Sequence, residues 1–160
     1  MGPDTLADGQ LMYTLLKEGP IEVSCVLPYE VDTDSACEFL LAAEEYAIIG
    51  GETIPYLLSL CETGEAMLWS VNVNEEMQAL MITDEPIYRH GPALRVRILA
   101  GEKMEAWLGV LQDALREWAL RIGAIHVELF GRPGWERVFG KYGKYLPKSK
   151  SMHFIFDLPA

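Results

Sequence analysis

Cysteine and histidine are scarce in this sequence of 160 residues, and none stands at the spacing of a redox or metal motif. The three cysteines, Cys25, Cys37 and Cys61, are odd in number and form no C-x-x-C pair. They predict neither a disulfide framework nor a zinc cluster, so we expect them to be reduced, small apolar residues. His126 and His153 lie far apart in the sequence with no third ligand at a recognisable spacing, and no metal site is predicted.

Basic residues are also few, since 13 lysines and arginines stand against 24 acidic residues, for a formal net charge of -11. Such a chain repels phosphate backbones, which argues against direct binding of nucleic acid. The same charge is compatible with a basic partner surface, or with solubility alone. No apolar run approaches the roughly 18 residues of a membrane span, and the first residues do not read as a signal peptide. We therefore expect a protein of a reducing cytoplasm, or of an assembly made there.

Two common catalytic motifs are missing. Ser24, Ser59 and Ser70 lie in no G-x-S-x-G elbow, so a serine hydrolase is not predicted. No phosphate-binding P-loop is present either.

Apolar residues, by contrast, are plentiful. They make up 50% of the chain, enough for a sizeable core in a domain of this length. Residues 1–20 are rich in Gly, Pro and Asp and are predicted to form an N-terminal arm, with a short helix over 11–16. Residues 21–160 are predicted to form a single domain.

Alternating and helical patterns predict the elements of that domain. Strands are expected at 21–26, 66–73, 77–83, 93–99, 125–130 and 152–158. Helices are expected from residue 32 or 33 to 49, from 53 to 63, from 104 to 122 and over 134–142. On the third strand of the central run, Arg95 and Arg97 are expected on the face opposite Leu94, Val96 and Ile98. Trp69, Trp107 and Trp118 are expected in the core, since each falls among apolar residues.

This order, β-α-α-β-β-β-α-β-α-β, predicts an α/β protein, more narrowly an α+β mixed sheet. The sheet should be mainly antiparallel, with helices on both faces and a right-handed crossover through the long helix.

The order and two segments resemble the Gcn5-related N-acetyltransferase (GNAT) family. The segments are Gly64-Glu65-Ala66-Met67-Leu68-Trp69, and Gly131 to Phe139 followed by Lys141-Tyr142-Gly143. The same pieces resemble small GNAT-like proteins encoded by tailed bacteriophages. The resemblance implies a V-shaped cleft between the strands at 94–99 and 125–130.

The resemblance also implies an R/Q-x-x-G-x-G/A loop that binds the pyrophosphate of acetyl-CoA before the long helix. The corresponding residues here are Leu99, Ala100, Gly101, Lys103 and Met104, with Glu102 among them. Only Gly101 fits the motif, and the Glu102 carboxylate would repel a phosphate. Lys103 could offset that charge without restoring the backbone geometry. We therefore expect no tightly bound cofactor, and acetyl-CoA only if the protein is an enzyme.

Two tests of the family's catalytic residues, for a general acid and for a general base, give a mixed answer. Phe139 takes the place of the tyrosine that serves many members as general acid, leaving Tyr142 and Tyr145 as substitutes. Glu128 is the candidate general base, because it alternates away from Val127 and Leu129. The other acidic candidates lie at predicted strand ends and are expected to be solvated: Glu75, Glu76, Asp84 and Glu85.

Two functions remain open. The first is a degenerate GNAT fold of tailed-phage origin, acting as a virion-associated or assembly protein-binding module, with Arg132 and Trp135 at the partner surface. It would reside in the host cytoplasm or in the phage particle, with other virion proteins as partners and an oligomeric state that the sequence does not fix. The second is an acetyl-CoA-dependent N-acetyltransferase acting on a small or protein amine, for which the acidic surface would suit a basic or polyamine-like substrate.

Overall fold

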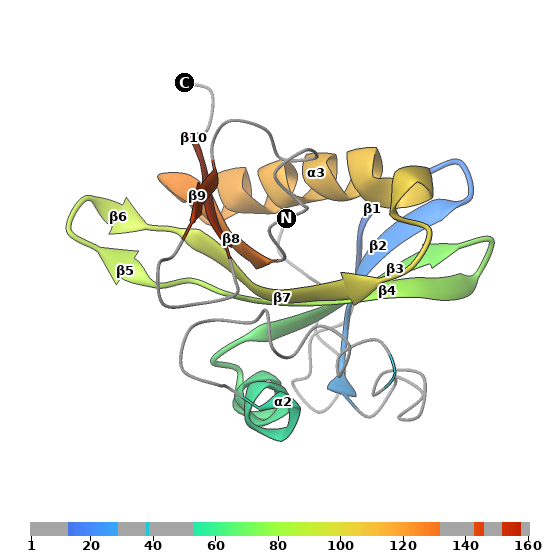
Figure 1. Cartoon of the computed structure of the whole chain (residues 1–160), viewed down its shortest axis with the longest axis horizontal. Helices are drawn as coiled ribbons and strands as arrows, with labels where there is room; N and C mark the ends of the chain where they lie inside the picture. Colours follow the sequence, from blue (N-terminus) through green and yellow to red (C-terminus); the bar gives the residue numbers. More distant parts are fainter. Residues whose placement is uncertain (1–12, 29–37, 39–52, 132–142, 146–151, 158–160) are drawn as a thin grey trace.

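The central feature of the computed structural model is an eight-stranded mixed sheet with strand order β1-β2-β3-β4-β7-β8-β10-β9 (Figure 1). The structure describes residues 13–28, 38, 53–131, 143–145 and 152–157. The strands are β1 (Tyr13–Glu18), β2 (Ile21–Val26), β3 (Met67–Val73), β4 (Glu76–Asp84), β5 (Ile87–Tyr88), β6 (Gly91–Pro92), β7 (Leu94–Gly101), β8 (His126–Gly131), β9 (Gly143–Tyr145) and β10 (Met152–Asp157), and the helices are α2 (Ile54–Thr63) and α3 (Met104–Arg121). The predicted α+β mixed sheet is confirmed.

Antiparallel pairing runs through the sheet except at one place. β7 and β8 are parallel neighbours, joined through α3 as a crossover helix. β5 and β6 form a separate hairpin between β4 and β7 that extends from one end of the sheet (Figure 1).

The N-terminal segment differs from its prediction. The apolar piece over 11–16, expected to be helical, is a strand from Tyr13 onward and pairs antiparallel with β2. Gly19 has a φ of +59°, a conformation in which glycine meets no steric penalty, and it lies in the two-residue turn that joins the strands. The register shifts between Thr14 and Leu16, so Leu15 is an extra residue opposite β2, and its side chain lies in the core. The sheet thus begins within the segment predicted to be an arm.

Helix α3 covers one face of the sheet with a continuous apolar stripe (Figure 1). Trp107 and Trp118 are buried, as predicted, together with Trp69 of β3. The rings of Trp69 and Trp118 meet edge to face at 5.4 Å. The Trp69 indole donates a hydrogen bond of 2.9 Å to the Thr83 hydroxyl, so its polar atom is satisfied inside the core.

Helix α2 covers the opposite face (Figure 1). Its predicted start and end are confirmed, since the Thr53 hydroxyl accepts from the Tyr56 amide at 3.3 Å and Gly64 ends the helix with a φ of +84°. Its buried face, Leu57 among others, packs against Leu80 and neighbouring strand residues in a second core cluster.

A β-bulge on β7 overturns the predicted facing of Ile98. Val96 pairs with Thr83 and Ile98 pairs with Ile82, so Arg97 is an extra residue opposite β4. The alternation therefore shifts by one position. Leu94 and Val96 lie in the core under α3, as predicted, whereas Ile98 lies in the core under α2.

Several predictions fall outside the described residues, namely Arg132 and the helices over 32–49 and 134–142, with Trp135, Phe139 and Tyr142 in the second of them. The long helix and the strands at 21–26, 66–73, 77–83 and 125–130 are confirmed. No described helix is long and apolar enough to cross a membrane.

Candidate active site at the β7–β8 fork

The sheet opens where β7 and β8 part. Their ladder comprises Leu94 with Val127, Arg95 with Glu128 and Val96 with Leu129. Beyond these pairs, among the described strands, β7 runs on to Gly101 beside β4 and β8 runs on to Gly131 beside β10. We call the place where the two strands part the β7–β8 fork; it lies between the strands where the resemblance implied a cleft.

Along the fork, β7 has backbone groups on its β8 side that pair with no described strand. The Glu102 amide donates to the Gln78 carbonyl of β4 at 3.0 Å, which fixes the side to which alternate residues point. Ala100 shares that direction, so the amides and carbonyls of Leu99 and Gly101 point to the opposite, β8 side. Such an edge can pair with an extended chain that carries amide groups.

The residues predicted to bind a cofactor follow this edge, but the first of them lie in the strand and not in a loop. Leu99 and Ala100 are buried, on opposite faces of β7. Gly101 is needed by the sheet itself, because a Cβ there would lie 2.5 Å from both the Gln78 carbonyl oxygen and the Ala79 Cβ. The β7–α3 loop is therefore two residues long, Glu102 and Lys103.

The last residue of this loop, Lys103, has an unusual backbone conformation just before the first turn of α3. Lys103 adopts a φ of +56° and a ψ of +41°, the left-handed conformation that glycine adopts without strain. The Ala106 amide bonds back to the Lys103 carbonyl at 2.9 Å, whereas the amides of Met104 and Glu105 have no partner inside the helix. These amides and the exposed Lys103 side chain favour an anion, while the carboxylates of Glu102 and Glu105 oppose it.

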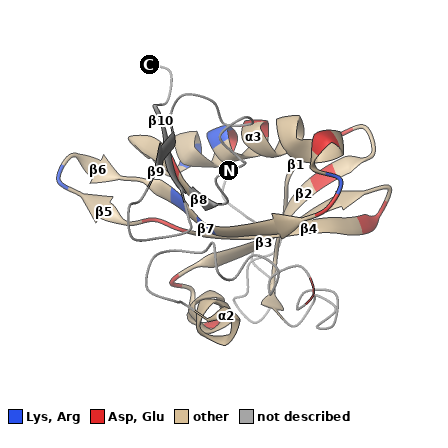
Figure 2. Cartoon of the chain, viewed as in Figure 1, with Lys and Arg blue, Asp and Glu red and all other residues tan. Residues whose placement is uncertain are grey.

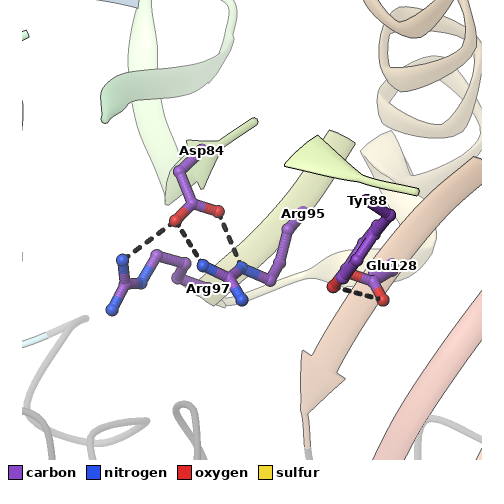
Figure 3. Close-up of polar contacts among 5 residues, drawn as sticks. All are labelled: Asp84, Tyr88, Arg95, Arg97 and Glu128. Carbon is purple, nitrogen blue, oxygen red and sulfur yellow. Dashed lines mark hydrogen bonds and ion pairs between the residues drawn. The ribbon is translucent and has the colours of Figure 1, made fainter. Parts of the chain in front are cut away.

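A row of charged side chains crosses the sheet at the closed end of the fork, on the face away from α3 (Figure 3). Asp84, Arg95 and Glu128 are register partners on β4, β7 and β8. Asp84 was expected to be solvated, but its carboxylate is largely buried and accepts from Arg95 at 2.7 and 2.8 Å and from Arg97 at 2.9 Å. The hydrogen bond to Asp84 raises the pKa of Arg95, which keeps that guanidinium charged.

Glu128 lies where the fork begins and is only 3% exposed. The Tyr88 hydroxyl lies 2.8 and 3.0 Å from its two carboxylate oxygens and donates to them (Figure 3). His126 Nε2 lies 3.5 Å from Glu128 Oε1, and its ring stacks on that of Tyr88 with centroids 5.8 Å apart. Burial, followed by the hydrogen bond to Glu128, raises the pKa of Tyr88, so this hydroxyl keeps its proton.

The other predicted catalytic residue within the described part, Tyr145, lies elsewhere. It ends β9 and pairs with Met152 of β10, which in turn pairs with Gly131 of β8. Tyr145 is thus two strands from β8, roughly 10 Å at the backbone, and three positions along from the Glu128 row.

Tyr88 is the residue that the sequence analysis missed. It lies on β5, in a hairpin whose two strands have only two residues each, and its contact with Glu128 spans 40 positions of sequence. No local pattern signals such a contact. Within the described residues, no group of three or more His, Cys, Asp and Glu side chains could hold a metal ion.

Comparison with known proteins establishes the fold. No protein-family profile and no curated protein matches the sequence. The RimL ribosomal L7/L12 α-N-protein acetyltransferase shares 11% identity at a TM-score of 0.57, over 97% of this chain and 98% of that one. FeeM, an N-acyl amino acid synthase from uncultured soil microbes, shares 11% identity at a TM-score of 0.59, over 87% of this chain and 91% of that one. A GNAT family acetyltransferase from Elizabethkingia anophelis, with acetyl-CoA bound, shares 10% identity at a TM-score of 0.54, over 88% of this chain and 100% of that one. The chain therefore has the fold of the GNAT acetyltransferases.

Proposed function

We propose that this protein is an acyl-coenzyme A-dependent N-acyltransferase. The observation that carries the proposal is the β7–β8 fork. It combines a β7 edge that pairs with no described strand, the first turn of α3 beyond the end of β7, and a buried carboxylate, Glu128, where the two strands meet. The fold similarity to acetyltransferases, one of them with acetyl-CoA bound, supports the same reading.

The residues of the fork fit the chemical groups of coenzyme A. The backbone groups of Leu99 and Gly101 would pair with the amides of its pantetheine arm, as strand edges do with extended peptides. The amides of Met104 and Glu105 would face its phosphates, with Lys103 as the nearby cation. Lys103 adopts the left-handed conformation that glycine adopts without strain, and strained residues of this kind cluster at functional sites. When bound, the coenzyme supplies an activated acyl group as its thioester.

The chain's own residues would then handle the proton of the acceptor. An amine is nucleophilic only after its ammonium form loses a proton, and Glu128 can accept that proton as general base. Tyr88 holds both oxygens of Glu128 and so fixes the carboxylate in place, as a positioning residue. Arg95, beside Glu128 in the register, balances its negative charge.

A second candidate is the binding module without chemistry, because two observations favour it. Gly101 has a packing role that needs no phosphate, and the carboxylates of Glu102 and Glu105 flank the helix end where a phosphate would bind. The more specific form of this second candidate is a virion-associated protein of phage origin, with Arg132 and Trp135 in its partner surface. That form stays a prediction.

Titration with acetyl-CoA separates the two candidates. At a concentration 100 times the Kd, a ligand raises the free energy of unfolding by about 2.7 kcal/mol, which for a domain of this size is a thermal shift of roughly 5–10 °C. We expect Lys103→Glu to weaken binding about tenfold, and Arg116→Glu, an equal charge change on the exposed side of α3, to leave it nearly unchanged.

Turnover is then measured as free thiol released with a panel of amines. Glu128→Gln should lower kcat by roughly 10²- to 10⁴-fold without loss of coenzyme binding. No thermal shift with acetyl-CoA would refute the enzyme and leave the binding module. A shift equally reduced in both charge variants would show that the coenzyme binds away from the fork.

A further inference from the structure

A second concave site lies apart from the fork. A cavity of about 860 Å³ opens at the end of the sheet where β2 and β4 end and β3 begins. The last turn of α2 lines one side of it, and Trp118 and Ile122 at the end of α3 line another. Its volume is typical of small-molecule sites, about 300–1,000 Å³.

Every charged side chain among the described lining residues is acidic. They are Glu62 on α2, Glu65, Asp84 and Glu85. Figure 2 shows the acidic positions of the described ribbon in red, among them a position on α2. Asp84 is neutralised by its ion pairs with Arg95 and Arg97. The three glutamates, by contrast, form no ion pair or hydrogen bond within the described part of the chain, so their charge is available to a ligand. Burial and the nearby Asp84 raise the pKa of Glu85, a cost that a bound cation would relieve.

Apart from Thr63 and Thr83, the other described side chains of the lining are apolar or aromatic. Met67, Leu68 and Cys25 line the cavity beside the Trp118 indole. An indole ring attracts an ammonium group through its face, while aliphatic side chains favour methylene groups. The lining thus suits a ligand with positive charges on an apolar stem.

The cavity also adjoins the row of charged residues that leads to Glu128. Asp84 is both a lining residue of the cavity and the first member of the row Asp84, Arg95, Glu128. Neighbouring strands lie about 4.8 Å apart, so Asp84 and Glu128 are separated by roughly 10 Å at the backbone. An alkyl diamine or polyamine is long enough to keep one ammonium group in the cavity while another approaches Glu128.

We propose that this cavity binds the charged end of the acceptor, and that the acceptor is a small alkyl diamine or polyamine. The inference rests on the proposed function for the reacting end of the amine. Binding in the cavity itself requires no coenzyme and can be measured without it.

Affinity is the first test, by calorimetric titration with 1,5-diaminopentane and with the uncharged 1,5-pentanediol. We expect the diamine to bind at least tenfold more tightly than the diol, and less tightly as salt is raised. The combined change of Glu62, Glu65 and Glu85 to Gln should weaken diamine binding roughly tenfold or more.

The matched control removes the same charge elsewhere. Glu18, Glu75 and Glu76 are exposed at the end of β1 and at the β3–β4 turn, away from the cavity, and their change to Gln should leave the affinity within about twofold. Equal loss in both triple variants, or equal binding of diamine and diol, would overturn the proposal.

Location is the second test, because the tryptophan side-chain N–H signals in an amide spectrum report on the two sites separately. Trp118 lines the cavity, whereas the Trp107 indole donates to the Glu102 carbonyl at 2.8 Å beside the fork. Trp118→Phe assigns the first signal. The diamine should move the Trp118 signal and leave that of Trp107 in place, and acetyl-CoA should move the signal of Trp107.

These outcomes separate the two proposals. If the diamine shifts only the Trp118 signal and acetyl-CoA does not bind, the cavity proposal is supported and the acyltransferase proposal is refuted. If acetyl-CoA shifts the Trp107 signal and the diamine does not bind at millimolar concentration, the acyltransferase proposal is supported and the cavity proposal is overturned.

Discussion

Gly101 can be replaced by alanine to test why a glycine stands at the end of β7. The added Cβ would lie 2.5 Å from the Gln78 carbonyl oxygen and 2.5 Å from the Ala79 Cβ, and it meets backbone that cannot rotate away. Forcing such contacts costs about 1–3 kcal/mol. Alanine also restricts the unfolded chain, which returns roughly 0.4–1 kcal/mol. We expect Gly101→Ala to lower the free energy of unfolding by about 1–2 kcal/mol.

Gly109 provides the matched control within α3. It is exposed, and a Cβ there meets nothing within 4 Å. Alanine is the better helix former, so Gly109→Ala should raise the free energy of unfolding by about 0.5–1 kcal/mol. The two values are read from urea unfolding curves with the slope compared between variants. If Gly101→Ala is as stable as the parent protein, packing does not explain why position 101 holds a glycine. Ligand binding would then be the remaining explanation.

Two further predictions concern titratable side chains. Tyr88→Phe should lower the free energy of unfolding at pH 7 by about 1 kcal/mol, since it removes a half-exposed hydrogen bond to a carboxylate. Because burial and Glu128 raise the pKa of Tyr88 above its ordinary 10.0 in the folded state only, that contribution is present below pH 10 and is lost as the pH rises through the folded value. The parent protein should therefore lose more stability than Tyr88→Phe between pH 9 and 11, and parallel losses would contradict the contact. Burial raises the pKa of Cys61 to about 12, so at pH 8 its thiolate fraction should be roughly 1,000-fold lower than in the unfolded chain. Iodoacetamide labelling followed by peptide mass analysis should find Cys61 slow in native protein and fast in urea, and equal rates would refute the assigned environment.

The sequence was sufficient for much of the fold because the main elements are locally encoded. The α3 stripe and the Thr53 and Gly64 ends of α2 each depend on residues within a few positions of one another. The face of β8 that carries Glu128 was also predictable, since strand alternation alone places it opposite Val127 and Leu129.

The errors arise where distant strands decide the outcome. The β7 bulge depends on how β4 pairs with it, and the stretch around Arg97 reads as an uninterrupted alternation. Asp84 was taken for a solvated turn residue because its ion pairs depend on the same register. The segment from Tyr13 was taken for a helix because its apolar run is too short to show a period, and only pairing with β2 makes it a strand.

The ladder between β7 and β8 has three pairs, whereas those that flank it, β4 with β7 and β8 with β10, have six each. Rupture of that short ladder would break fewer backbone hydrogen bonds than rupture of either ladder that flanks it. A displacement of β8 and β10 away from β7 would leave the longer ladder between β8 and β10 intact.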